Sequence, residues 1–247
     1  MNYYLAAAYR KNGQPAEAKK VYDAILGLKP EEKDAYFLRG SAELELGDYE
    51  SAKADFDKAI SMDPKNYDRL IEIYEALEDY GYREVGQEYL QNVLNTAKQL
   101  DAYDSGRIYY YLGDYQKAYL ALEEAKGKGG VDSYLYLGKA YAATGDYNYA
   151  SSVYSNYLSK QGPDAEIYNQ LGLCEMAKKD YQKALEAFQA GKQIEGNSLM
   201  QTLSFNEIVA YEYLQDYQKA AVLLKAYLQN YPDDQAAIRE QQFLSTR

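Results

Sequence analysis

A short motif recurs along this chain at nearly constant spacing, and that spacing constrains the fold more than any other feature. Gly-Asp-Tyr occurs three times, and in each copy an alanine lies three residues after the tyrosine. Two looser copies keep Asp-Tyr and the alanine, so that the five copies begin at Gly47, Gly113, Gly145, Lys179 and Gln215. The steps between them are 66, 32, 34 and 36 residues, which is a period near 34 with one degraded copy inside the first gap. A period of this length predicts a stack of helix–turn–helix repeats.

Residues 131–164 show most clearly what one repeat contains. Leu137 and Tyr141 have the i, i+4 spacing of one helical face. Gly145 is expected to end this helix in a left-handed conformation. Asp146 is then expected to cap the second helix by accepting backbone N–H bonds. The repeat therefore predicts two helices joined by a tight turn.

Small residues stand where the two predicted helices must approach each other closely. Gly138 lies in the first helix and Ala150 in the second, among larger neighbours such as Tyr154. Alternating small and large side chains allow facing helices to interdigitate at native density. One repeat departs from this arrangement, because it has Tyr74 and Gly86 where the others have a small residue and an alanine.

These positions resemble the tetratricopeptide repeat family, whose pattern is an aromatic, Leu-Gly and Tyr in the first helix, then Ala and an aromatic in the second. The residues that match are Tyr134, Leu137, Gly138, Tyr141, Ala150 and Tyr154. The resemblance implies an all-α fold, a right-handed superhelical solenoid of antiparallel helix pairs with about 15 helices. We expect seven repeats over residues 1–234 and a capping helix over 235–247, with the repeats at 1–32, 33–66, 67–98, 99–130, 131–164, 165–200 and 201–234.

Composition excludes several classes of function. Lys and Arg number 27 against 38 Asp and Glu, a net charge of −11, which disfavours binding to nucleic acid or an anionic membrane surface. Histidine is absent, so the usual general acid–base group and the commonest metal ligand are missing. No apolar run is long enough to span a bilayer. We therefore expect no enzyme activity, no cofactor, no metal and no membrane span.

The resemblance also implies where a partner would bind. In the family, the first helices of successive repeats line the concave face of the superhelix, and aromatic groups with polar tips suit a bound peptide or helix. Carried over residue by residue, the predicted groove consists of Tyr4, Phe37, Glu72, Tyr103, Arg107, Tyr110, Tyr136, Lys139, Asn169, Phe205, Asn206 and Tyr213. Many of the 31 tyrosines are expected to be packing residues instead. In the run 109–111, Tyr109 matches a packing position, which leaves its two neighbours for the groove or for solvent.

Three more specific sites are weighed against simpler interpretations. A clamp for the carboxylate of chaperone tails is rejected, because the corresponding positions hold Tyr3, Ala7, Leu38, Asp68 and Glu72, and the acidic pair would repel a carboxylate. The acidic cluster Glu72, Glu75, Glu78 and Asp79 could bind a basic partner or a divalent cation, but it lacks calcium-loop spacing, which favours a solvated face. The single cysteine, Cys174, is expected to be a small buried hydrophobe.

The leading hypothesis is a non-catalytic scaffold that binds a protein or peptide on the concave face. Two alternatives remain, a sensor for a short signalling peptide and an assembly component of a bacterial cell-envelope complex. The compartment is left open between cytoplasmic and extracytoplasmic, the latter as a lipoprotein with its leader removed, because Met1 falls inside the first predicted helix. The chain is expected to be a monomer unless uncapped ends drive self-association.

Overall fold

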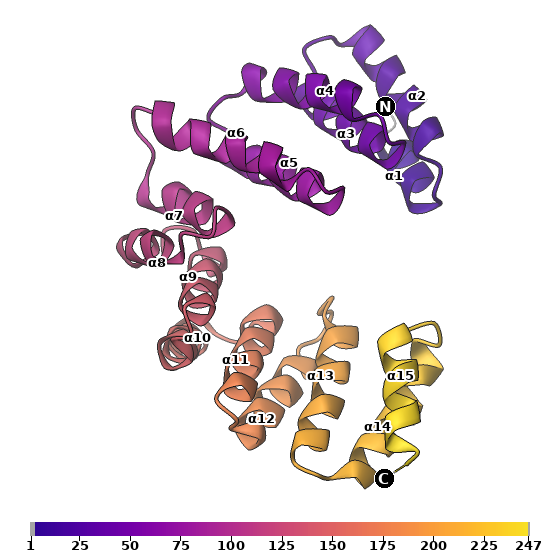
Figure 1. The fold of residues 1–247 in the computed structure, drawn as a ribbon, viewed down its shortest axis with the longest axis vertical. Helices are drawn as coiled ribbons and strands as arrows, with labels where there is room; N and C mark the ends of the chain where they lie inside the picture. Colours follow the sequence, from indigo (N-terminus) through magenta and orange to yellow (C-terminus); the bar gives the residue numbers. More distant parts are fainter. Residues whose placement is uncertain (1–2, 247) are drawn as a thin grey trace. The chain divides into compact units, whose positions relative to one another are not determined.

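The computed structural model describes residues 3–246, which form fifteen α-helices and no strand. The chain divides into two compact units, Met1–Leu100 and Asp101–Arg247 (Figure 1). Unit 1 contains α1 (Tyr3–Lys11), α2 (Pro15–Leu28), α3 (Lys33–Glu45), α4 (Tyr49–Met62), α5 (Tyr67–Asp79) and α6 (Arg83–Thr96). Unit 2 contains α7 (Ala102–Tyr111), α8 (Tyr115–Glu124), α9 (Val131–Ala143), α10 (Tyr147–Gln161), α11 (Ala165–Ala177), α12 (Tyr181–Lys192), α13 (Met200–Tyr213), α14 (Tyr217–Asn230) and α15 (Gln235–Leu244).

The helices are arranged in antiparallel pairs, and a turn of three residues joins the two helices of each pair. We call the odd-numbered members from α1 to α13 first helices and the even-numbered members from α2 to α14 second helices. Each second helix packs against its own first helix and, within a unit, against the first helix that follows. First helices also contact one another: α3 contacts α5, and α9 contacts both α7 and α11. The predicted all-α architecture of helix pairs is confirmed.

The turn inside each pair keeps one backbone geometry whether or not it contains glycine. In all five motif copies the N–H of the aspartate donates to the carbonyl oxygen five residues earlier, at 2.9 Å. This bond requires a left-handed residue before the aspartate. Gly145 supplies it with φ of 85°, and in the two looser copies Lys179 and Gln215 adopt φ of 63° and 62°. The turn therefore persists where its glycine has been lost.

A Lys179→Gly substitution is expected to stabilise unit 2 by about 1 kcal/mol, because it relieves the steric cost of a left-handed non-glycine residue. Ala177→Gly, two residues earlier at the last position of α11, is the control and should destabilise by less than about 1 kcal/mol. Urea denaturation followed by circular dichroism measures both. Equal losses from the two substitutions would contradict the assignment of strain to position 179.

The aspartate of the motif caps the second helix in four of the five copies. Asp48, Asp114, Asp180 and Asp216 each accept a hydrogen bond from the backbone N–H three residues ahead. The prediction for Asp146 was wrong, because its side chain makes no such bond. The hydroxyl of Thr144 donates to the carbonyl oxygen of Tyr141 at 2.8 Å and lies 3.3 Å from Asp146 Oδ2.

Glycines on the first helices allow large side chains of the second helices to approach the backbone. A methyl group at Gly138 would lie 2.3 Å from Cζ of Tyr154, and one at Gly172 would lie 2.3 Å from Cε1 of Phe188. Both aromatic side chains are fully buried. The close contact between the two helices of a pair therefore depends on the absence of a side chain at these positions.

The departure at Tyr74 and Gly86 is an exchange of sizes within one helix pair. Tyr74, on the first helix α5, is 1% exposed, and Gly86 lies opposite it on α6. A methyl group at Gly86 would lie 2.9 Å from Cδ2 of Tyr74. The contact is complementary in the same way as the others, with the large and small partners interchanged.

The last helix, α15, covers one side of α14. Ala237 and Leu244 of α15 share a buried cluster with Ala220 and Leu224 of α14. Such a helix shields the terminal face of a stacked array. The division of the chain into seven repeats with boundaries at particular residues stays a prediction.

Candidate partner-binding surface

Five of the predicted groove residues in unit 2 lie close to one another on consecutive first helices. They contact one another, or two further residues, across neighbouring helices, from α7 through α9 and α11 to α13. We call this set the first-helix strip: Tyr110, Tyr111, Tyr136, Lys139, Glu166, Asn169 and Asn206. Tyr111 was predicted to face either the groove or solvent. Glu166 was not predicted, although it lies three residues before Asn169 and therefore on the same helical face.

Three tyrosines form the aromatic part of the first-helix strip. The rings of Tyr110 and Tyr136 meet edge to face with centroids 5.5 Å apart, and the hydroxyls of Tyr111 and Tyr136 lie 2.9 Å apart. All three side chains are half-buried. Burial, with Tyr115 and Tyr136 nearby, raises the pKa of Tyr110. The phenol therefore stays neutral at physiological pH and presents a hydrogen-bonding group on an apolar ring.

Charged and amide groups continue the strip on the following helices. Lys139 Nζ on α9 lies 3.6 Å from Glu166 Oε1 on α11, and both side chains are about one third exposed. Asn206 Nδ2 on α13 donates to Asn169 Oδ1 on α11 at 2.9 Å, where Asn169 is 5% exposed. The strip thus runs from aromatic to polar, and its open part is formed by the tyrosines and the Lys139–Glu166 pair.

Three other predicted residues of unit 2, Tyr103, Arg107 and Phe205, have packing contacts within their own helix pairs. Arg107 is 7% exposed, with its guanidinium over the ring of Tyr103 at 4.3 Å and Nη2 2.6 Å from Asp104. Phe205 packs against Tyr227 of its own second helix, with centroids 5.7 Å apart. Arg107 is therefore buried, whereas Tyr103 and Phe205 are half-buried like the tyrosines of the first-helix strip.

Tyr213 is the most exposed predicted residue of unit 2. Its side chain is 55% exposed, and its ring stacks on that of Tyr181, a residue of α12, at a centroid distance of 4.8 Å. Among residues 3–246, the ring contact of Tyr213 is with Tyr181 and not with a tyrosine of the first-helix strip. The structure therefore places Tyr213 on an aromatic patch of its own.

In unit 1, two of the three predicted residues line one open pocket on the first helices. We call it the acidic pocket; its volume is about 360 Å³ and its lining residues are Arg10, Phe37, Ser41, Glu72, Glu75, Ala76, Asp79 and Tyr80. Arg69 stacks over the ring of Phe37 at 4.0 Å and also pairs with Glu72 at 2.9 Å. The third residue, Tyr4, is 93% exposed on α1 and does not line the pocket.

The described residues hold little reactive chemistry. Cys174 is 3% exposed, as predicted for a buried hydrophobe, and burial raises its pKa to about 12, so it does not form a thiolate near neutral pH. Over residues 3–246, no group of three or more His, Cys, Asp or Glu side chains could hold a metal ion. In the same range, every helix falls short of the length and apolarity that crossing a bilayer requires.

Comparison with known sequences identifies the family. A sequence model of the tetratricopeptide repeat matches residues 3–67 and 135–198, and a second tetratricopeptide model matches residues 205–234. The first model alone covers more than half of the chain. The chain belongs to the tetratricopeptide repeat family. Proteins with this repeat generally act as non-catalytic scaffolds for interactions with other proteins.

Curated relatives share only a short segment with this tetratricopeptide protein. The FK506-binding protein-like proteins of Mus musculus and Homo sapiens are 42% and 40% identical to it over 62 residues. That segment is 25% of this chain and 18% of each relative, so the chain spans far less than two thirds of their length.

Solved structures share the fold at low sequence identity. Yeast Tom70 matches 87% of this chain with a TM-score of 0.62 and 16% identity, over 48% of its own chain. A tetratricopeptide repeat protein from Parabacteroides merdae matches 84% of this chain with a TM-score of 0.57 and 15% identity, over 82% of its own chain. A chain of the APC/C hetero-tetramer Cut9-Hcn1 matches 97% of this chain with a TM-score of 0.59 and 17% identity, over 48% of its own chain.

Proposed function

We propose that this tetratricopeptide protein is a scaffold that holds an extended peptide segment of a partner protein along the first-helix strip of unit 2. The observation that carries the proposal is the contact of strip residues across four consecutive first helices, which gives a continuous surface. Its half-buried tyrosines offer large apolar area with polar tips at low entropic cost. The fold in the Cut9-Hcn1 hetero-tetramer shows a similar array within a protein complex.

The charged part of the strip sets the chemistry of the proposed peptide. Lys139 and Glu166 lie 3.6 Å apart with both side chains partly exposed, so each can exchange its partner for a group on the peptide. The neighbouring tyrosines favour an apolar or aromatic side chain on the same segment. We therefore expect a peptide that carries an acidic residue adjacent to apolar residues, with the acidic group at Lys139.

Lys139→Glu is expected to weaken such a peptide at least about tenfold, because it places like charge at a desolvated contact. Lys126→Glu is a closely matched control, because Lys126 is 31% exposed and 3.5 Å from Glu123, against 34% and 3.6 Å for Lys139 and Glu166. Peptides would be selected from a random library on the parent chain. Their dissociation constants would then be measured by isothermal titration calorimetry with the parent and both variants.

A peptide that loses affinity with Lys126→Glu and not with Lys139→Glu would place the binding surface away from the first helices and overturn the proposal. Tyrosine deletions are less decisive, because Tyr136 also packs against Tyr110 and shares a hydrogen bond with Tyr111. Tyr136→Phe keeps the ring and removes only the hydroxyl, so it tests the polar tip at small cost in stability.

A further inference from the structure

An open pocket lies between the last three helices of unit 2, and none of its described lining residues belongs to the first-helix strip. Its volume is about 510 Å³. It is lined by two acidic, three aromatic and one aliphatic side chain: Glu212, Glu240, Tyr213, Tyr217, Phe243 and Val209. We call it the α13–α15 pocket. Aromatic walls with a few converging polar groups are typical of a binding site.

Both charged side chains that line the α13–α15 pocket are acidic. Glu212 on α13 and Glu240 on α15 lie so close that the charge of Glu240, after burial, raises the pKa of Glu212 to about 8. Two carboxyls in contact do not both ionise readily, so the pair holds a proton near neutral pH. The pair still carries negative charge, and the described lining residues include no cation to neutralise it.

The carboxyl of Glu212 also has unused hydrogen-bonding capacity. Its Oε1 is buried and has no hydrogen-bond partner among residues 3–246. The two buried glutamates of unit 2 differ, because Glu175 pairs with Lys178 at 2.8 Å and Glu207 pairs with Lys192 at 2.6 Å. A buried carboxylate oxygen without a donor is costly. The missing partner of Glu212 is therefore a cationic hydrogen-bond donor.

The aromatic side chains of the α13–α15 pocket favour the same kind of ligand. Tyr213 is 55% exposed and Phe243 is 40% exposed. The ring of Tyr217 meets that of Phe243 edge to face, with centroids 6.4 Å apart. The face of an aromatic ring attracts a cation. The rings and the carboxyl pair thus both favour an organic cation.

We propose that the α13–α15 pocket binds the guanidinium of an arginine side chain of a partner protein, which pairs with Glu212 and Glu240 and stacks on an aromatic wall. Guanidinium is planar, offers five donors and is more weakly hydrated than an ammonium, so it combines carboxylate pairing with stacking. A free amino acid would bring its own carboxylate towards two acidic groups, which favours an arginine within a polypeptide. As the guanidinium binds, the carboxyl pair releases its proton to solvent.

The probe is the capped peptide acetyl-Gly-Arg-Gly-amide, titrated in large excess and followed by isothermal titration calorimetry. Two buffers with different enthalpies of ionisation, at pH 6.5 and again at pH 9, give the number of protons released. We expect release of up to one proton at pH 6.5. At pH 9 we expect little release and at least about tenfold tighter binding, because the carboxyl pair is already ionised while guanidinium keeps its charge.

Glu212→Gln is expected to weaken binding at least about tenfold at pH 9 and to abolish the proton release at pH 6.5. Glu124→Gln, at an exposed position of α8, changes the net charge equally and should leave both unchanged. Phe243→Leu keeps an apolar side chain but removes the aromatic face, and should weaken binding by about threefold. Circular dichroism at both pH values checks that each variant remains folded.

Three results would overturn the proposal. The first is equal binding of the peptide in which citrulline, the uncharged counterpart, replaces arginine. The second is an equal loss of affinity with Glu124→Gln and Glu212→Gln. The third is no binding at either pH to the parent or to Arg247→Gln, a variant included because Arg247, outside the described residues, is a cation of the same chain. Tighter binding of free L-arginine than of the capped peptide would overturn the assignment to a protein partner.

Discussion

Gly138→Ala is expected to destabilise unit 2 by about 2–3 kcal/mol, a large effect for the addition of one methyl group. The new methyl would lie 2.3 Å from Cζ and 2.6 Å from the hydroxyl of Tyr154, whose ring is fully buried and cannot move without opening α9 from α10. Thermal unfolding followed by circular dichroism at 222 nm would measure the loss, with urea denaturation giving the free energy.

Gly27→Ala is the control for the change from glycine to alanine itself. Gly27 lies inside α2 and nothing approaches within 4 Å of a methyl group there, so alanine should stabilise by about 0.5–1 kcal/mol. In a double-mutant cycle, Tyr154→Leu should recover part of the loss at Gly138, because the smaller side chain vacates the clash. Additive effects of the two substitutions would show that the Gly138 and Tyr154 contact does not limit the approach of the helices.

The second large effect is the dependence of stability on the protonation of Glu43. This carboxyl is 3% exposed on α3, 3.4 Å from Lys19 Nζ, and its Oε2 accepts no hydrogen bond from the residues that the structure describes. Burial, and next the charge of Asp55, raise its pKa to about 7, against the opposing effects of Lys19 and Arg39. An ionised group in this position is costly to bury.

The raised pKa fixes the sign of the pH dependence. Between the ordinary pKa of 4.5 and about 7, the folded chain binds more protons at Glu43 than the unfolded chain does. The contribution of Glu43 to the free energy of unfolding is therefore present below pH 4.5 and is lost as the pH rises to about 7. Glu43→Gln should reduce the dependence of the free energy of unfolding on pH between pH 4.5 and about 7. At pH 8 it should stabilise the chain by about 2 kcal/mol relative to the parent.

Urea denaturation of parent and variant at intervals from pH 5 to pH 8 measures this effect. Glu212, whose burial and contact with Glu240 raise its pKa to about 8, is present in both chains, so the difference between them isolates Glu43. Glu88→Gln, at an exposed position of α6, is the control and should change stability by less than about 0.5 kcal/mol at any pH. A parallel pair of curves for parent and Glu43→Gln would show that Glu43 titrates alike in both states.

The structure of the turns could be predicted from the sequence because the motif that forms them repeats. The motif predicted the turn at every copy, and the left-handed Lys179 shows that the turn depends on the whole helix pair rather than on glycine alone. The missing cap at Asp146 could not be predicted, because the motif around it is the same as in the copies whose aspartate does cap the second helix. The exchange of Tyr74 and Gly86, visible in the sequence as a departure, became intelligible only when the two were seen opposite each other.

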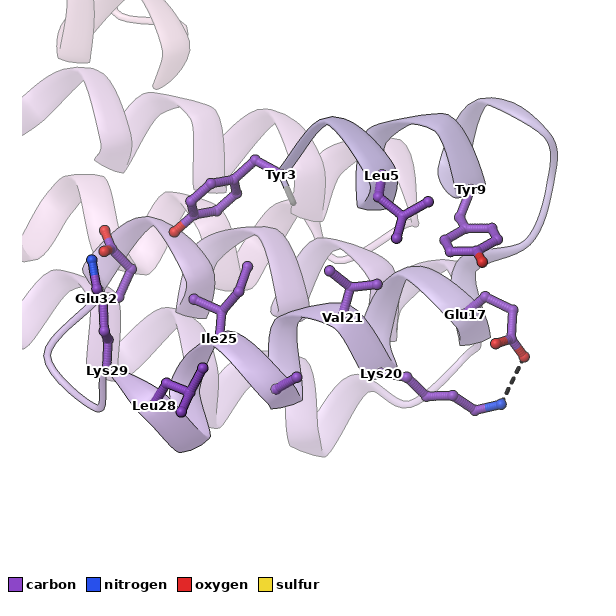
Figure 2. Close-up of a pocket in the computed structure, with 11 residues that line it drawn as sticks. Tyr3, Leu5, Tyr9, Glu17, Lys20, Val21, Ile25, Leu28, Lys29 and Glu32 are labelled. Carbon is purple, nitrogen blue, oxygen red and sulfur yellow. Dashed lines mark hydrogen bonds and ion pairs between the residues drawn. The ribbon is translucent and has the colours of Figure 1, made fainter. Parts of the chain in front are cut away.

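The candidate surface was less predictable, because its contacts join different helix pairs. Spacing places Asn169 on a particular face of α11, but not its burial beneath Asn206 from the next first helix. Arg107 was predicted as a groove residue, and its guanidinium lies over the ring of Tyr103 in the same helix. The open apolar pocket between α1 and α2 (Figure 2) was not predicted, although Leu5 and Tyr9 repeat the spacing of Leu137 and Tyr141.

The thiol of Cys174, the single cysteine, can report local opening of the helix stack. Cys174 is 3% exposed on α11, and its pKa of about 12 leaves it unreactive while that helix is packed. Alkylation by a neutral-pH thiol reagent must therefore wait until α11 separates from its neighbours. The labelling rate, compared with that of the unfolded chain, gives the free energy of opening at α11. Because an array can open segment by segment, this local value can be smaller than the free energy of complete unfolding.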